Sequence, residues 1–383
     1  MYYFDFASTT PIDKKVFDEM KKYFCEEFGN PSSLHRLGQN ALEAVDVARE
    51  KIKNIIEADS VNEIIFTSSA TESNNLIIKG ISFDYFFKKG NKSHIISSEI
   101  EHPSIIEPLK NLEKFGIAEI SLIKPEKSGL IEWRSVNKTI KENTILISLH
   151  YVNSEIGVIQ SITDIAKEIK KINESRAEKI IFHIDASQSL TEDISVKNLG
   201  VDAMTLSGHK IYGPKGIGLL YKKENIKIEN LISGSGQEFE LRAGTENVAG
   251  IVGLAKALEI IKDEKIEIKN KLNYLRNYFL ERLNESKIEF EINGVLNYLS
   301  LKILNIYFKN TDAQDLLMYL GQNALCVSAG MACKSRALIP NSVVNILYDE
   351  TRAKKSVRFS FGKDTTKEEI DYLVEILTRL NFF

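Results

Sequence analysis

The sequence predicts an α/β fold in which a mostly parallel central sheet is flanked by helices and followed by a smaller α+β domain. In the first three-fifths of the chain, short apolar runs alternate with amphipathic helical stretches. Several of these runs are apolar throughout, as expected for strands that helices cover on both faces. After a long, charge-rich helical stretch the alternation stops, which indicates a separate, smaller unit.

The expected elements follow from this pattern. Strands are predicted at 63–67, 94–98, 144–149, 179–184, 203–206 and 216–221, and helices at 40–57, 73–79, 102–114 and 162–173. A long helix over 251–286 precedes strands near 298–307 and 356–361 and helices near 312–320 and 366–380. Thr365 and Glu368 have the spacing of a capping box at the start of the last helix. We place the domain boundary near residue 255, giving a large domain at 12–255 and a small domain at 256–383 that includes residues 1–11.

Composition excludes several classes of function. The 383 residues carry a formal net charge of -3, so the charge gives no argument for binding nucleic acid or an anionic membrane. The N-terminal segment lacks the pattern of a signal peptide, and no apolar run approaches the roughly 18 to 20 residues that span a bilayer. Three scattered cysteines without a CxxC pair favour neither a disulfide framework nor a metal site. We therefore expect a cytoplasmic protein that binds no metal.

Small or polar residues follow five of the predicted strands. These segments are 67–73, 99–103, 152–155, 185–188 and 207–210. In an open parallel sheet the carboxyl ends of the strands meet at one edge, and ligands bind there. The five segments together predict one ligand site at that edge.

Two of these segments suggest the chemistry of a ligand. Ser69, Ala70 and Thr71 open a predicted helix whose free N–H groups suit a phosphate, although ordinary N-capping explains them as well. Asp185 ends a buried strand, where a carboxylate needs a partner. A protonated ring nitrogen would be one such partner, and a helix cap or an ion pair would be another.

Lys210 and Cys333 are the candidate reactive groups. Lys210 follows a strand at the same edge of the sheet, where partial desolvation would lower its pKa and allow imine formation, although most lysines are solvated surface charges. His102 and His209, considered alone, fit a helix cap or a core position. Cys333 lies in the small-residue segment 328–336, in which two neighbouring cations would favour the thiolate.

Nine segments, in this order, resemble the cysteine desulfurases of the NifS/IscS type, which are fold-type-I pyridoxal-phosphate (PLP) enzymes. The resemblance runs from the first residues nearly to the last, and the order of the segments makes it specific. The segments are 4–11, 28–35, 67–75, 101–103, 152–157, 183–188, 207–216, 241–247 and 358–362.

The resemblance assigns the PLP contacts. Lys210 would hold PLP covalently, His102 would stack on its ring as a further catalytic residue, and Asp185 would pair with the ring nitrogen. Asn153 and Gln188 would bond the ring oxygen. The phosphate would be held by Thr71, Ser207 and His209, together with Thr245 from across a dimer interface.

The resemblance also implies the reaction and the partners. Arg358 would bind the carboxylate of L-cysteine, with Asn30, Asn153 and Arg242 as further substrate contacts. Lys210 would remove the α-proton, and Cys333 would take the sulfur as a persulfide while alanine leaves. A homodimer that passes sulfur to an acceptor or scaffold protein, for iron–sulfur cluster assembly or thiolation, is the expected setting.

Other readings stay open at this point. A selenocysteine lyase or another PLP enzyme of the aminotransferase fold would use the same cofactor residues, and Cys333 is what distinguishes a desulfurase from them. A non-catalytic sulfur-transfer subunit is a third reading, against which the intact Lys210, Asp185 and Cys333 argue. Met331 and Lys334 depart from the common family loop, and the short segment after the last helix puts docking to a scaffold protein in question.

Overall fold

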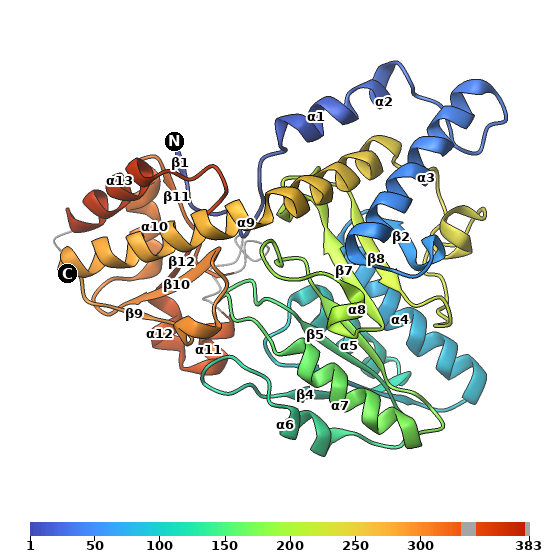
Figure 1. Ribbon diagram of the computed structural model, residues 1–383. Coiled ribbons are helices and arrows are strands. Elements are labelled where there is room, and N and C mark those ends of the chain that lie inside the picture. The colour runs from blue at the N-terminus through green and yellow to red at the C-terminus, as the bar shows by residue number, and fades with distance from the viewer. Residues whose placement is uncertain (331–341, 380–383) are drawn as a thin grey trace.

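A computed structural model describes residues 1–330 and 342–379, and its centre is a seven-stranded sheet (Figure 1). The strand order is β2-β8-β7-β6-β5-β3-β4. The strands are β2 (Ile64–Thr67), β3 (Ser93–Ser98), β4 (Ala118–Ile123), β5 (Thr144–His150), β6 (Ile181–Asp185), β7 (Ala203–Ser207) and β8 (Gly218–Lys222). The block β7-β6-β5-β3-β4 is parallel, and β8 runs antiparallel to both of its neighbours. The predicted mostly parallel sheet is confirmed.

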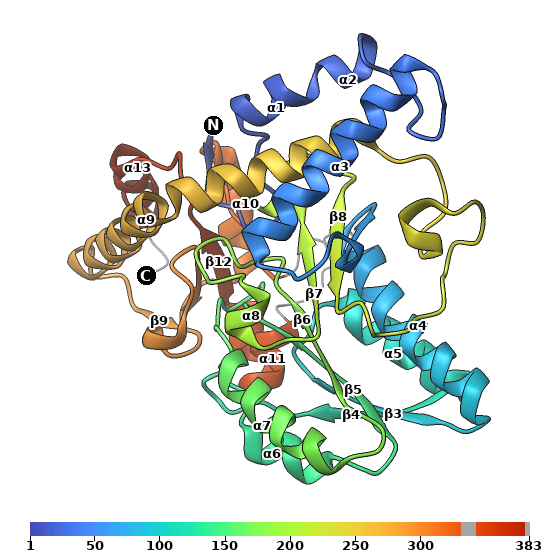
Figure 2. The same ribbon diagram turned by 45° about the vertical axis from the view of Figure 1, so that its right-hand side comes forward.

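Helices cover both faces of this large sheet (Figure 2). Side chains of α4 (Ala70–Lys89) and α5 (Pro103–Lys114) form one core with strand residues such as Ile65. Ile64 and Phe66, which alternate with Ile65 along β2, point into the core on the other face. That second core contains side chains of α3 (Arg36–Ile56), α6 (Trp133–Thr139), α7 (Ile162–Ser175), α8 (Val196–Leu199) and α9 (Val248–Glu285).

The 38-residue helix α9 links the large sheet to the C-terminal part of the chain (Figure 1). At 1.5 Å per residue its length is about 57 Å. It packs against α1 (Lys14–Met20), α2 (Lys22–Cys25) and α3, and also against α13 (Lys367–Thr378). The helix confirms the element predicted at 251–286, and the boundary predicted near residue 255 falls inside it.

A second, three-stranded antiparallel sheet has the order β12-β10-β9. Its strands are β9 (Phe290–Ile292), β10 (Ile303–Phe308) and β12 (Ser356–Ser360), accompanied by α10 (Ala313–Gln322), α11 (Ser342–Leu347), α12 (Glu350–Lys354) and α13. The N-terminal strand β1 (Tyr2–Tyr3) pairs with β11 (Leu325–Cys326), and Asp5 bridges to Ser360. The first residues therefore pack beside this small sheet.

Three details differ from the sequence-based expectation. Strand β4 was not predicted, because Glu119 and Ser121 interrupt its apolar residues and only the two end residues of this edge strand are buried. The predicted strand at 298–307 begins only at Ile303, since residues 296–298 form a 3-10 turn. The capping box of α13 uses Thr366 and Glu369, one residue later than predicted, because the Thr365 hydroxyl accepts the Gly362 N–H instead. Within residues 1–330 and 342–379, no helix combines the length and the apolar content of a membrane crossing.

Candidate active site

The carboxyl ends of five strands surround a cavity of about 180 Å³, as the sequence predicts. The N-terminal segment and β12 complete its wall, so the cavity lies between the two sheets. The lining residues are Ala7, Ser8, Ser69, Ala70, Thr71, Ile100, His102, Ser104, His150, Val152, Asn153, Ser154, Asp185, Ser187, Gln188, Ser207, His209, Lys210 and Arg358.

Lys210 lies in a single 3-10 turn, Gly208–Lys210, directly after β7. Its Nζ donates hydrogen bonds to the carbonyl oxygens of Ala7 at 2.6 Å and Ser8 at 2.8 Å. These bonds hold the amine at the cavity wall instead of in solvent. The N-terminal segment, folded over from the small sheet, therefore fixes the predicted reactive lysine.

A hydrogen-bond chain joins Asp185 to His102. The Asp185 carboxylate accepts from Asn74 Nδ2 at 2.8 Å and from the Ser187 N–H at 3.0 Å. Asn74 Nδ2 also lies 2.9 Å from Ser104 Oγ, which lies 2.8 Å from His102 Nδ1. Because the Ser104 N–H donates to His102 Nδ1 as well, that nitrogen is an acceptor. The chain fixes the orientation of both the carboxylate and the imidazole at the cavity.

The N-terminus of α4 points its free N–H groups toward one end of the cavity, where Thr71, Ser207 and His209 also lie. Gly218 of β8 allows the backbone at the start of α4 to lie close to this strand, since a Cβ at residue 218 would come within 2.4 Å of the Ser69 main-chain carbonyl carbon. Burial and the charges of Lys210, Lys215 and Lys302 lower the pKa of His209 to about 4, so its imidazole is neutral at pH 7. A helix N-terminus with hydroxyl and imidazole groups around it suits a phosphate.

Asn153 and Gln188 both line the cavity, and both are also fixed by neighbouring backbone. Asn153 Oδ1 accepts the N–H groups of Glu155 and Ile156, and its Nδ2 donates to the Ile100 carbonyl at 3.0 Å. Gln188 Nε2 donates to the Ala7 carbonyl at 2.8 Å. Both amides therefore have fixed positions at the wall.

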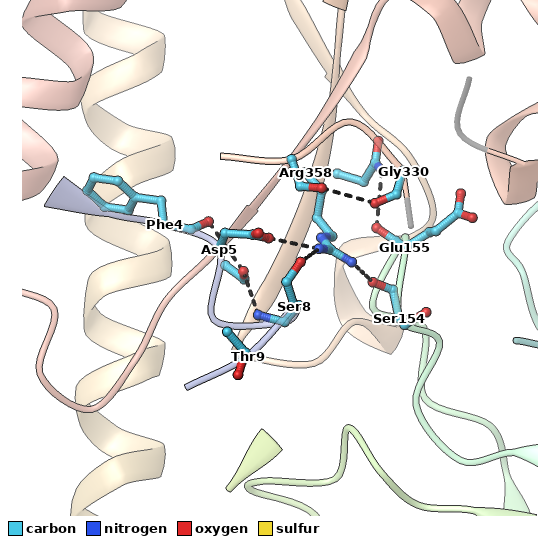
Figure 3. Close-up of polar contacts among 12 residues, drawn as sticks. Phe4, Asp5, Ser8, Thr9, Ser154, Glu155, Gly330 and Arg358 are labelled. Carbon is cyan, nitrogen blue, oxygen red and sulfur yellow. Dashed lines mark hydrogen bonds and ion pairs between the residues drawn. The ribbon is translucent and has the colours of Figure 1, made fainter. Parts of the chain in front are cut away.

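Arg358 reaches the cavity from β12 with a side chain that is only 2% exposed. Its two terminal nitrogens donate to Ser154 O at 2.6 Å, Asp5 Oδ1 at 2.8 Å and Ser8 Oγ at 2.7 Å (Figure 3). Its buried Nε has no hydrogen-bond partner among the described residues. A guanidinium that is fixed in this way and retains a buried donor suits a carboxylate ligand.

Three predicted site residues lie outside the cavity of the single chain. Asn30 is exposed and accepts the Ser32 N–H, while Thr245 is also exposed. Arg242 forms an ion pair with Glu72 in the first turn of α4 at 2.9 Å. Burial alone would raise the pKa of Glu72, but hydrogen bonds from Arg242 and Ser68 lower it below its ordinary value. Cys333 lies outside the described residues.

Sequence reasoning missed a buried polar network beside the cavity. Gln160 Oε1 accepts the Ile131 N–H, and its Nε2 donates to Gly129 O and to His150 Nε2 at 3.0 Å. The two backbone groups fix the amide, so His150 Nε2 is an acceptor and its Nδ1 carries the proton. That proton is donated to Glu101 Oε1 at 2.8 Å. The sequence signal of this network was a pair of ionisable residues, Glu101 and His150, at the ends of neighbouring apolar strands.

Comparisons with known proteins agree along the whole chain. Residues 2–373 match the aminotransferase class-V family. Cysteine desulfurase IscS of Dictyoglomus turgidum is 39% identical over 383 residues, covering 99% of this chain and 94% of the relative. The Colwellia psychrerythraea IscS is 41% identical, with 98% and 91% covered.

Solved structures give the same result. A NifS-like protein superposes with a TM-score of 0.91 at 32% identity, covering 99% of both chains. SspA in complex with cysteine superposes with a TM-score of 0.82 at 33% identity, covering 96% of this chain and all of that one.

Proposed function

Since this chain belongs to the class-V aminotransferase family and to its cysteine desulfurases, we propose that it transfers the sulfur of L-cysteine to Cys333 and releases L-alanine. The observation that carries the proposal is the cavity itself. It brings an amine (Lys210), a carboxylate (Asp185) and a guanidinium (Arg358) together from three distant parts of the chain. These are the groups that an amino-acid substrate and a pyridine cofactor require.

The donor and acceptor set of the cavity fits PLP, on which this family depends. The N-terminus of α4 with Thr71, Ser207 and His209 would take the phosphate, and Asp185 would face the ring nitrogen. Lys210 would hold the cofactor covalently, and His102 would lie on its ring. When bound, PLP supplies an electron sink for negative charge at the substrate α-carbon.

The chain's own residues then bind and orient the substrate. Arg358, which lines the cavity, takes the carboxylate of cysteine with an N–H group that Ser154, Asp5 and Ser8 do not occupy. Lys210, which lines the cavity, removes the α-proton as a general base. Ser328, five residues before Cys333 in sequence, exchanges two backbone hydrogen bonds with Arg358.

Sulfur transfer to Cys333 balances without an added oxidant or reductant. The Cys333 thiolate attacks the sulfur of the substrate, an S–S bond forms and the C–S bond breaks. The substrate carbon takes a proton, so that alanine leaves and Cys333 retains a persulfide. A thiol acceptor or a scaffold protein would then take this sulfur, for iron–sulfur cluster assembly or thiolation.

We further propose a cytoplasmic homodimer. Side chains of the segment that joins α2 to α3 are strongly exposed, with Phe28 at 65% and Leu34 at 94%, and Phe24 of α2 is exposed at 59%. Apolar exposure of this extent supports a protein–protein interface. Thr245, which is exposed in the single chain, would reach the phosphate site of the second copy. Sedimentation of the purified protein tests the dimer.

The direct test of the function is turnover of L-cysteine. Purified protein with PLP and a thiol reductant should release alanine and sulfide in equal amounts. Lys210→Ala should release neither, and Lys215→Ala, five residues later in sequence and outside the cavity lining, should behave as wild type. Absence of alanine from the wild-type reaction, with PLP bound, would refute the proposed function.

A further inference from the structure

Lys302 is a buried lysine that neither the sequence motifs nor the mechanism uses. It precedes β10 in the small sheet, and its side chain is 0% exposed. Its Nζ donates to the main-chain carbonyl of Lys210 at 3.2 Å and to Gln188 Oε1 at 3.4 Å. A buried ammonium is costly unless its surroundings compensate the charge, so its contacts are informative.

These contacts place Lys302 one layer behind the cavity wall. Gln188 and Lys210 line the cavity, and Lys302 does not. Gln188 Nε2 and Lys210 Nζ donate to the same Ala7 carbonyl, at 2.8 and 2.6 Å. Lys302, Gln188, Ala7 and Lys210 thus form a closed ring of hydrogen bonds. The ring joins the small sheet, the N-terminal segment and the large sheet at one point.

The Lys302 ammonium fixes the orientation of the Gln188 side-chain amide. An ammonium only donates hydrogen bonds, so it must face the amide oxygen. The amide NH2 then faces the opposite way, toward the Ala7 carbonyl and the cavity. If the amide were turned over, its NH2 would meet a cation and its oxygen would meet a carbonyl. Lys302 therefore keeps a hydrogen-bond donor of Gln188 directed toward the site.

Lys302 also brings a second cation close to Lys210. The charged groups whose fields reach it are Lys210, Glu192, Arg358 and Asp5. Burial, together with the charge of Lys210, lowers the pKa of Lys302 to about 7, while Glu192 opposes this shift. The repulsion between two cations is mutual, so the charge on Lys302 disfavours a positive charge on the Lys210 nitrogen.

We propose that Lys302 is a positioning residue of the PLP site, which orients the Gln188 amide toward the ring oxygen and disfavours the positive charge on the Lys210 nitrogen. The inference rests on the PLP site of the proposed function, and not on the fate of the sulfur. It assigns Lys302 no contact with substrate or cofactor.

The test measures PLP binding and the pH titration of its visible absorbance in three variants. Lys302→Met removes both the donor and the charge, and should weaken PLP binding about tenfold, as for loss of one oriented hydrogen bond. Lys302→Gln retains a donor and should bind PLP within about threefold of wild type. In both Lys302 variants the pH midpoint of the Lys210–PLP absorbance should rise, because the variants lack the positive charge that Lys302 carries below its pKa of about 7.

Lys222→Met is the matched control. Lys222 is also buried, and burial lowers its pKa, but it ends β8 at the opposite edge of the large sheet, paired with Ala203. Its replacement should change neither the affinity for PLP nor the midpoint. Thermal unfolding verifies that each variant folds. If Lys302→Met does not fold, Lys302→Gln still tests the pH midpoint of the Lys210–PLP absorbance.

A midpoint that stays in place, or moves downward, in the folded Lys302 variants overturns the proposal. So does a Lys302→Met protein with wild-type affinity for PLP. Neither readout needs cysteine. A wild-type protein that binds PLP but releases no alanine would therefore refute the desulfurase function, while the effect of Lys302 on the cofactor site would still be measured.

Discussion

Replacement of Arg358 by lysine tests how the site recognises an amino acid. The guanidinium is held at three points by Ser154, Asp5 and Ser8, which leaves two of its five N–H groups, one on Nη1 and one on Nε, without these partners. Lysine retains the charge but has no planar fork, so it cannot satisfy these partners and a ligand together. One charge-assisted hydrogen bond is worth about 1.5–3 kcal/mol, which predicts a loss of about 10- to 150-fold in kcat/KM for cysteine.

The loss should fall mainly on KM. The substrate carboxylate does not react, so its bond to Arg358 is present in both the ground state and the transition state. The assay is steady-state alanine formation at varied cysteine, with the absorbance of bound PLP showing that the cofactor site is intact. Arg352→Lys is the control, because Arg352 bonds Asn293 and Glu291 away from the cavity. Wild-type kcat/KM in Arg358→Lys would show that Arg358 does not bind the substrate.

Three further predictions concern other groups. Asp185→Asn should lower kcat about 100- to 1,000-fold, as for loss of one preorganised electrostatic stabiliser, while PLP still binds. Single-turnover alanine formation measures this rate, and an unchanged kcat would contradict the role of Asp185. Lys210→Ala should abolish the visible absorbance of covalently held PLP as well as turnover, and retention of that absorbance would contradict the assignment of Lys210. Burial lowers the pKa of His183 and of His209 from 6.5 to about 4, so between these pH values the unfolded chain binds more protons than the folded chain. The free energy of unfolding should therefore fall as pH falls from 6.5 toward 4. A urea unfolding midpoint that is constant across this pH range would contradict the prediction.

The large sheet was predictable because its strands are buried on both faces. Six of its seven strands were predicted within about two residues, several of them from uninterrupted apolar runs. Edge strand β4 was missed because it lacks such a run, and the antiparallel direction of β8 has no signature in the sequence of the strand itself. The Thr-Thr-Lys-Glu-Glu segment at 365–369 offers two capping boxes, and the contact of Thr365 with Gly362 decides between them.

The candidate site was predictable to the extent that it lies at strand ends. Asp185 ends β6, and Gln188 and Lys210 each come three residues after the end of a strand, so that topology alone brings them together. Asn74 and Lys302 could not be found in this way, because each acts through a partner more than 90 residues away in sequence. A buried amide or ammonium reveals its role only through that partner.

Sulfur transfer to Cys333 is the central claim, and the mass of the protein after one turnover tests it most directly. Wild-type protein with PLP and L-cysteine, without reductant, should form one alanine per site and gain one sulfur atom on the peptide that contains Cys333. Cys333→Ala should bind PLP with the same absorbance but gain no sulfur and release no alanine beyond background. Normal alanine formation in Cys333→Ala, or sulfur carried on a different cysteine of the wild-type protein, would contradict the proposed mechanism.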